Sequence, residues 1–155
     1  MKTLVIYDSF FGNTEQIARS IAAALGDASN VGLVKVTEFN LESLEGVELL
    51  IVGSPTRSFQ ASEGTMSFLK GLPANALKGV KVAAFDTRLL LSEIESSTLR
   101  FIVNTGGYAA KRIADNLKKK GGMLASPPEG FLVKGEKGPL VDGELERAAE
   151  WARAI

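Results

Sequence analysis

Short apolar runs that end at turn residues predict the strands of this chain. They cover residues 3–7, 31–36, 49–52, 80–85 and 123–133, and the last run is interrupted by residues 126–130. The central runs are continuously apolar rather than alternating, which is typical of parallel strands covered on both faces. The run at 31–36 is more polar, and we expect it at an edge of the sheet.

Apolar residues with helical spacing lie between these runs. Ile17, Ile21 and Leu25 stand four residues apart, after a capping candidate at Asn13. Further helices are predicted around residues 66–69, over 109–120 and from near Asp142 to the end of the chain. The apolar stretch 89–103 is expected to be a buried helix, with a lid or a dimer patch as the alternatives.

Strands and helices therefore alternate about five times along a chain of 155 residues, the size of one domain. The alternation implies a single α/β domain over residues 1–155, a doubly wound five-stranded parallel sheet with helices on both faces. For the strand order 2-1-3-4-5, a ligand binds outside the carboxyl ends of the strands, at the switch point between the first and third strands. The loops after strands one, three and four are the ones to inspect.

The chain contains no Cys and no His. These absences exclude disulfides, iron–sulfur ligation, thiolate nucleophiles and a Ser-His-Asp triad, and they remove the common protein ligands of haem and zinc. We expect no metal site. Redox chemistry in this chain would need an organic cofactor.

The charges of the chain cancel, with 18 basic and 18 acidic residues. This balance argues against nucleic acid as a partner, and no polybasic segment is present for anionic lipid. The amino terminus has no apolar signal region, and no apolar run approaches membrane-spanning length. We expect a cytoplasmic protein, a monomer or a weak dimer, that binds neither nucleic acid nor a membrane.

The loop after the first strand, residues 8–14, has the chemistry of a phosphate site. Ser9, Asn13 and Thr14 offer side-chain donors, Gly12 allows close approach of the backbone, and the start of a helix adds free N–H groups. No Lys or Arg lies in the loop, so it is not a Walker A motif, and the GxGxxG motif is absent as well. An ordinary helix cap is the alternative interpretation.

The run Val5-Ile6-Tyr7-Asp8-Ser9-Phe10-Phe11-Gly12-Asn13-Thr14-Glu15 resembles the phosphate-loop signature of flavodoxins. In that signature a strand is followed by a Ser or Thr, a Gly, and a Thr that opens the helix. Residues 44–56 are similar to the third strand and first flavin loop of the family, and residues 121–131 are similar to the end of short flavodoxin-like domains. The resemblance covers essentially the whole chain.

The resemblance implies a bound FMN held by three loops. By position, the phosphate loop would be Ser9, Phe10, Phe11, Gly12, Asn13 and Thr14, the first isoalloxazine loop would be Ser54, Pro55, Thr56, Arg57, Ser58 and Phe59, and the second would begin with Asp86, Thr87 and Arg88. Flavodoxins usually stack the flavin ring on aromatic residues from the last two loops. Phe59 can fill the first of these places, whereas no aromatic residue follows Arg88 until Phe101.

Two features depart from the family. Flavodoxins are typically strongly acidic and meet basic reductases through long-range attraction, whereas this chain is neutral, so the usual partners do not simply carry over. No Gly lies between Ser54 and Gln60, where the family commonly has one.

Three functions stay open on the sequence. The resemblance implies an FMN-dependent electron carrier whose partner is a redox protein or an NAD(P)H-linked reductase. The second hypothesis is an NAD(P)H-dependent FMN or quinone reductase. Some such relatives carry a stretch similar to Pro55-Thr56-Arg57. In addition, Arg57 and Arg88 could bind an anionic substrate or the phosphates of NAD(P)H. The third is a flavodoxin-like domain without flavin that serves binding or regulation.

Overall fold

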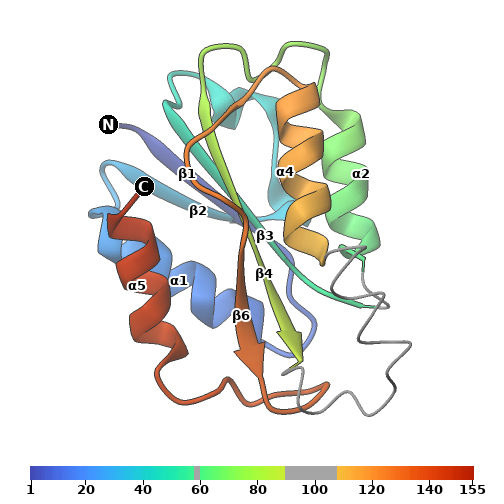
Figure 1. Ribbon diagram of the computed structural model, residues 1–155. Coiled ribbons are helices and arrows are strands. Elements are labelled where there is room, and N and C mark those ends of the chain that lie inside the picture. The colour runs from blue at the N-terminus through green and yellow to red at the C-terminus, as the bar shows by residue number, and fades with distance from the viewer. Residues whose placement is uncertain (58–59, 90–107) are drawn as a thin grey trace.

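A computed structural model describes residues 1–57, 60–89 and 108–155 of the chain (Figure 1). The predicted helix in the stretch 89–103 therefore lies, apart from Leu89, outside the described residues. In chain order the elements are β1 (Thr3–Tyr7), α1 (Asn13–Leu25), β2 (Val31–Lys35), β3 (Leu49–Pro55), α2 (Glu63–Gly71), β4 (Lys81–Leu89), α4 (Ala109–Lys119), β5 (Met123–Leu124), β6 (Glu129–Val133) and α5 (Glu144–Arg153). Two 3-10 turns, Val36–Glu38 and Leu41–Leu44, lie between β2 and β3.

The strands form a parallel sheet in the order β2-β1-β3-β4, and the other edge of β4 carries both β5 and β6. β5 pairs with the beginning of β4, and β6 pairs with its end, so the two act as one strand interrupted at residues 125–128. The predicted order 2-1-3-4-5 is confirmed. Glu129 and Gly130, predicted within the interruption, are instead paired residues of β6.

Helices cover both faces of the sheet, with α1 and α5 on one face and α2 and α4 on the other (Figure 1). Alternate side chains of each central strand therefore enter two different cores. In β1, Val5 and Tyr7 pack with α1 and α5, whereas Leu4 and Ile6 belong to the core under α2 and α4. This two-sided burial explains why residues 4–7, 49–52 and 82–85 of the central strands are continuous apolar runs. β2 is the more exposed edge strand that its polar sequence predicts.

The polar residues that end β3 and β4 lie within the sheet, which corrects the predicted boundaries. Ser54 and Pro55 are the last residues of β3, and β4 continues through Asp86, Thr87 and Arg88 to Leu89. The reason is pairing at long range, because β6 supplies hydrogen-bonding partners for β4 from Phe85 to Leu89. These residues therefore have rigid strand positions rather than loop positions.

No helix in residues 1–57, 60–89 and 108–155 is long and apolar enough to span a membrane.

The contact between Gly53 on β3 and Phe85 on β4 gives a test of the packing at the carboxyl end of the sheet. A Cβ at Gly53 would lie 2.0 Å from Cζ of the Phe85 ring. We expect G53A to lower the free energy of unfolding by about 2 kcal/mol, because a well-packed core cannot absorb an extra methyl group. In the control G71A, at the end of α2, a Cβ would meet nothing within 4 Å, and the change should stay within about 0.5 kcal/mol. Urea denaturation measures both variants, and equal losses would contradict the packing argument.

Candidate functional site

A cavity of about 320 Å³ lies at the carboxyl ends of the strands. Most of the residues predicted for the site line it, namely Ser9, Phe10, Phe11, Asn13, Thr14, Pro55, Thr56, Arg57, Thr87 and Arg88. Leu89, Val133 and Glu136 also line it, and the sequence analysis missed them. Ser54 and Asp86 are fully buried and do not line the cavity. Ser58 and Phe59 lie outside the described residues.

The loop between β1 and α1 is held in shape by its own side chains. The Ser9 hydroxyl accepts hydrogen bonds from the amides of Gly12 (3.1 Å) and Glu15 (3.4 Å), and the carboxylate of Asp8 accepts one from the Ser9 amide (2.9 Å). Gly12 is the N-cap of α1 and has φ 89°, a conformation that other residues adopt only with strain. These contacts fix the shape of the loop.

Backbone amides at the start of α1 remain without partners. The N–H groups of Phe10, Phe11, Asn13 and Thr14 form no hydrogen bond with any residue that the structure describes, and no side chain caps the helix. A helix start also carries a partial positive charge from its aligned peptide dipoles. Such a turn binds an anion that has several acceptor oxygens, of which a phosphate is the common case.

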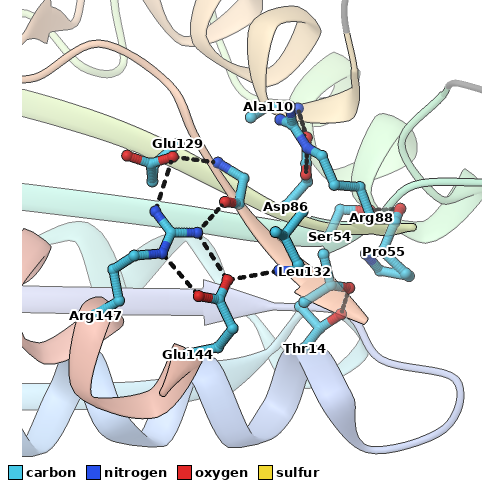
Figure 2. Close-up of polar contacts among 12 residues, drawn as sticks. Thr14, Ser54, Pro55, Asp86, Arg88, Ala110, Glu129, Leu132, Glu144 and Arg147 are labelled. Carbon is cyan, nitrogen blue, oxygen red and sulfur yellow. Dashed lines mark hydrogen bonds and ion pairs between the residues drawn. The ribbon is translucent and has the colours of Figure 1, made fainter. Parts of the chain in front are cut away.

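Two side chains of this loop fasten it to distant parts of the chain. The hydroxyl groups of Thr14 and Thr87 are 2.8 Å apart, which joins α1 to β4 (Figure 2). The side-chain amide of Asn13 donates to the carbonyl of Lys137, 3.2 Å away in the loop between β6 and α5. The prediction of Asn13 as the helix cap is therefore wrong, since Gly12 takes the cap position and the buried Asn13 side chain bonds the later loop instead.

A buried polar network connects the loop between β1 and α1 to the segment after β3. Ser62, the N-cap of α2, donates its hydroxyl proton to Asp8 (2.6 Å) and accepts from the Thr65 amide (3.2 Å). The Ser62 amide donates to the hydroxyl of Ser54 (2.9 Å). Because the single hydroxyl proton of Ser62 goes to Asp8, the Thr65 hydroxyl, 2.8 Å from it, acts as the donor of that pair. The loops after β1 and β3 are thus held by one set of hydrogen bonds.

Asp86 and Arg88 form an ion pair at the end of β4 (Figure 2). Two guanidinium nitrogens of Arg88 lie 2.7 and 2.8 Å from the two carboxylate oxygens, and the Ala110 amide donates to the same carboxylate at 2.9 Å. The guanidinium also stacks on the Tyr108 ring, 3.6 Å from its centroid. Burial raises the pKa of Asp86, while Arg88 and the Ala110 amide oppose that rise. Arg88 is therefore committed to a structural partner.

The loop between β6 and α5 is anchored beside the cavity by a second ion-pair cluster (Figure 2). Arg147 on α5 binds Glu144 (2.7 Å) and Glu129 (3.2 Å), and Glu144 accepts a hydrogen bond from the Leu132 amide (2.7 Å). Burial opposes ionisation of Glu144, but these donors outweigh it and lower the pKa of its carboxyl. Both ends of the loop are thereby fixed.

From this loop, Glu136 reaches Arg57 at the mouth of the cavity. The two charged groups are 3.4 Å apart, and the guanidinium of Arg57 lies 4.9 Å from the ring centroid of Phe10. Both charged side chains are at least half exposed, so the pair is a weak surface contact. Arg57 nevertheless lies over the phosphate loop rather than pointing away from the site.

The profile of the family described as "Flavodoxin domain" matches residues 4–126. The chain belongs to the flavodoxin family. Solved structures share its fold: flavodoxin 2 from Bacillus cereus has a TM-score of 0.73 at 24% identity, covering 99% of this chain and 97% of that one. A flavodoxin from the domain Archaea has a TM-score of 0.73 at 22% identity, covering 98% and 94%.

Larger proteins contain a comparable part. The rubredoxin:oxygen oxidoreductase of Desulfovibrio gigas has a TM-score of 0.72 at 22% identity, covering 99% of this chain but 35% of that one. Among curated proteins, a flavodoxin of Picosynechococcus is 44% identical over 45 residues, which are 29% of this chain and 26% of that flavodoxin. The match thus spans about a quarter of that relative.

Flavodoxins bind FMN, and FMN is therefore the cofactor of this chain as a member of the family. The described residues fit it. The unpaired amides of Phe10, Phe11, Asn13 and Thr14 need an acceptor such as the FMN phosphate. The buried hydroxyl of Thr56, on the cavity wall, also has no hydrogen-bond partner among the described residues.

Removal of Arg88 from its ion pair with Asp86 should lower the free energy of unfolding by an amount that depends on pH. R88M leaves the Asp86 carboxyl buried without a cation, so its pKa rises further above the value in the unfolded chain. The folded protein then holds a proton that the unfolded chain has lost, and stability falls as the pH rises through the folded-state pKa. We expect R88M to lose about 3 kcal/mol of unfolding free energy at about pH 8 and clearly less at about pH 5.

Denaturant titrations of the protein at the two pH values measure these losses. The double variant D86N/R88M has no titrating group at the pair, so its loss relative to the unaltered protein should differ little between the two pH values. An R88M loss that is equal at both pH values would contradict the role assigned to the pair.

Proposed function

We propose that this chain holds FMN in the cavity at the carboxyl ends of the sheet and serves as an electron carrier of the flavodoxin type. The observation that carries the proposal is the set of unpaired amides of Phe10, Phe11, Asn13 and Thr14, which offer hydrogen-bond donors to an anion beside that cavity. When bound, the flavin supplies the electron transfer, and the chain supplies binding, orientation and electrostatics. Its partner would be a redox protein or an NAD(P)H-linked reductase in the cytoplasm.

Each wall of the cavity has a separate task in this proposal. The amides of the phosphate loop bind the phosphate, and the Ser9 hydroxyl, which accepts from two amides, still has its proton to donate. Pro55, Leu89 and Val133 contribute apolar surface on which a flat ring can rest. The Thr56 hydroxyl is available to a polar edge of that ring.

The arrangement of the two arginines favours a carrier over a self-contained reductase. A site for the phosphates of NAD(P)H or for an anionic substrate would require guanidinium donors that are not already in use. Arg88 has two of its nitrogens on Asp86, and Arg57 is next to Glu136. Neither arginine is an unengaged cation facing the cavity.

The deciding experiment is a titration of the purified protein with FMN. We expect a yellow protein, or quenching of FMN fluorescence to one equivalent per chain, and negligible oxidation of NADPH by the loaded protein unless a separate reductase is added. Failure to bind FMN at high micromolar concentration would overturn the proposal. Rapid NADPH oxidation by the loaded protein alone would support a reductase in its place.

The phosphate loop can be tested with a matched pair of glycines. Gly12 caps α1 with φ 89° and ψ −8°, and Gly143 caps α5 with φ 89° and ψ −7°, and a Cβ at either residue would meet nothing within 4 Å. We expect G12A and G143A to lose about 1 kcal/mol of unfolding free energy each, from the same backbone strain. Only G12A should also weaken FMN binding, by about tenfold, because it shifts the amides around it. Equal FMN affinities in the two variants would exclude this loop as the phosphate site.

A further inference from the structure

The phosphate loop lacks positive charge for the group that it is proposed to bind. A phosphate monoester carries nearly two negative charges at neutral pH, whereas a helix start offers only about half of one positive charge. The Asp8 carboxylate, 8% exposed, lies directly before the loop and has no ion-pair partner among the described residues, so it adds to the deficit. Glu15, in the first turn of α1, is already paired with Arg19.

The fold brings two cationic side chains close to the loop from elsewhere in the chain. Arg57 lies over the Phe10 ring but is opposed by Glu136, 3.4 Å away. The ammonium group of Lys137 lies 5.9 Å from the ring centroid of Phe11, and it forms no salt bridge with any residue that the structure describes. Arg57 is thus partly neutralised by Glu136, whereas the charge of Lys137 is not paired with a carboxylate of the described residues.

The position of Lys137 is fixed by the backbone and not by its own side chain. Its carbonyl accepts the hydrogen bond from the Asn13 side chain, and Asn13 is itself one of the residues whose backbone amide is unpaired. The ion pairs of Arg147 with Glu144 and Glu129 hold α5 against β6 and so keep the intervening loop in place. The backbone therefore holds position 137 beside the start of α1, and a substitution of the side chain should not move it.

We propose that Lys137 is a specificity-determining residue that neutralises the phosphate of FMN and makes the site prefer FMN over riboflavin. The inference rests on the proposed function. It assigns the role to the loop between β6 and α5, far in sequence from the loop that supplies the amides. Because the contribution is electrostatic and the side chain is exposed, it should be moderate and sensitive to salt.

The test compares FMN with riboflavin, which has the same ring system without the phosphate. Apo-protein is titrated into each flavin by fluorescence at about 20 mM and about 300 mM NaCl. K137Q should raise the Kd for FMN about fivefold at low salt and change the Kd for riboflavin less than about twofold. K137E should raise the Kd for FMN by about twenty-five-fold, since it reverses the charge. High salt should reduce both differences.

K134Q is the matched control, because Lys134 is an exposed lysine of the same loop and, unlike Lys137, makes no cation–π contact with an aromatic ring of the described residues 9–14. It should change the Kd for FMN less than about twofold. Equal effects of K134Q and K137Q on FMN would overturn the proposal, and so would an equal weakening of FMN and riboflavin by K137Q. If the unaltered protein binds neither flavin, the proposed function itself fails, an outcome distinct from both of these.

Discussion

The first turn of an α-helix contains N–H groups that the helix cannot satisfy, and the structure around the site is arranged to keep those of α1 open and in place. A side-chain cap would normally take one of them, yet α1 begins at Gly12 without such a cap. The Ser9 hydroxyl accepts from the amides of Gly12 and Glu15 and shapes the loop, while the amides of Phe10, Phe11, Asn13 and Thr14 have no partner among the described residues. The hydrogen bonds from Asp8 and Thr14 lock the two ends of the loop to α2 and β4.

The neighbouring end of β4 shows the opposite use of polar residues. Asp86 and Arg88 have the side chains of a ligand site, but each satisfies the other and both are tied to the start of α4. A buried carboxylate needs such compensation, since an unpaired charge in the core would cost several kcal/mol. The pair thus stabilises the floor of the cavity, and the open donors are left to the loop of α1.

Much of this fold could be predicted from sequence because burial on both faces leaves a plain pattern. Residues 4–7 of β1 and 49–52 of β3 are continuous apolar runs, and α1 repeats Ile17, Ile21 and Leu25 at helical spacing. The turn between β1 and α1 could also be predicted, because Gly12, Asn13 and Thr14 follow the apolar run of β1 and precede the helical repeat. Its partnership with β4 through Thr14 and Thr87 follows only from the three-dimensional structure.

The remaining features depend on contacts between distant residues, for which the sequence has no local signal. The extension of β4 to Leu89 requires β6, which begins 40 residues later along the chain. Val133 and Glu136 reach the cavity because α5 is pinned to β6, and nothing in the stretch 133–137 itself indicates a ligand. Phe59, predicted to stack on the flavin ring, lies outside the described residues.

The hydrogen bond between Asn13 and Lys137 has a consequence for the order in which the protein is made. The two residues are 124 positions apart, and their hydrogen bond joins the start of α1 to the loop between β6 and α5. A ribosome delivers the amides of α1 early, but the loop that closes over them emerges only after β6 has been synthesised. The hydrogen bond can therefore form only after residue 137 has been synthesised, and we expect the start of α1 to lack this support until then.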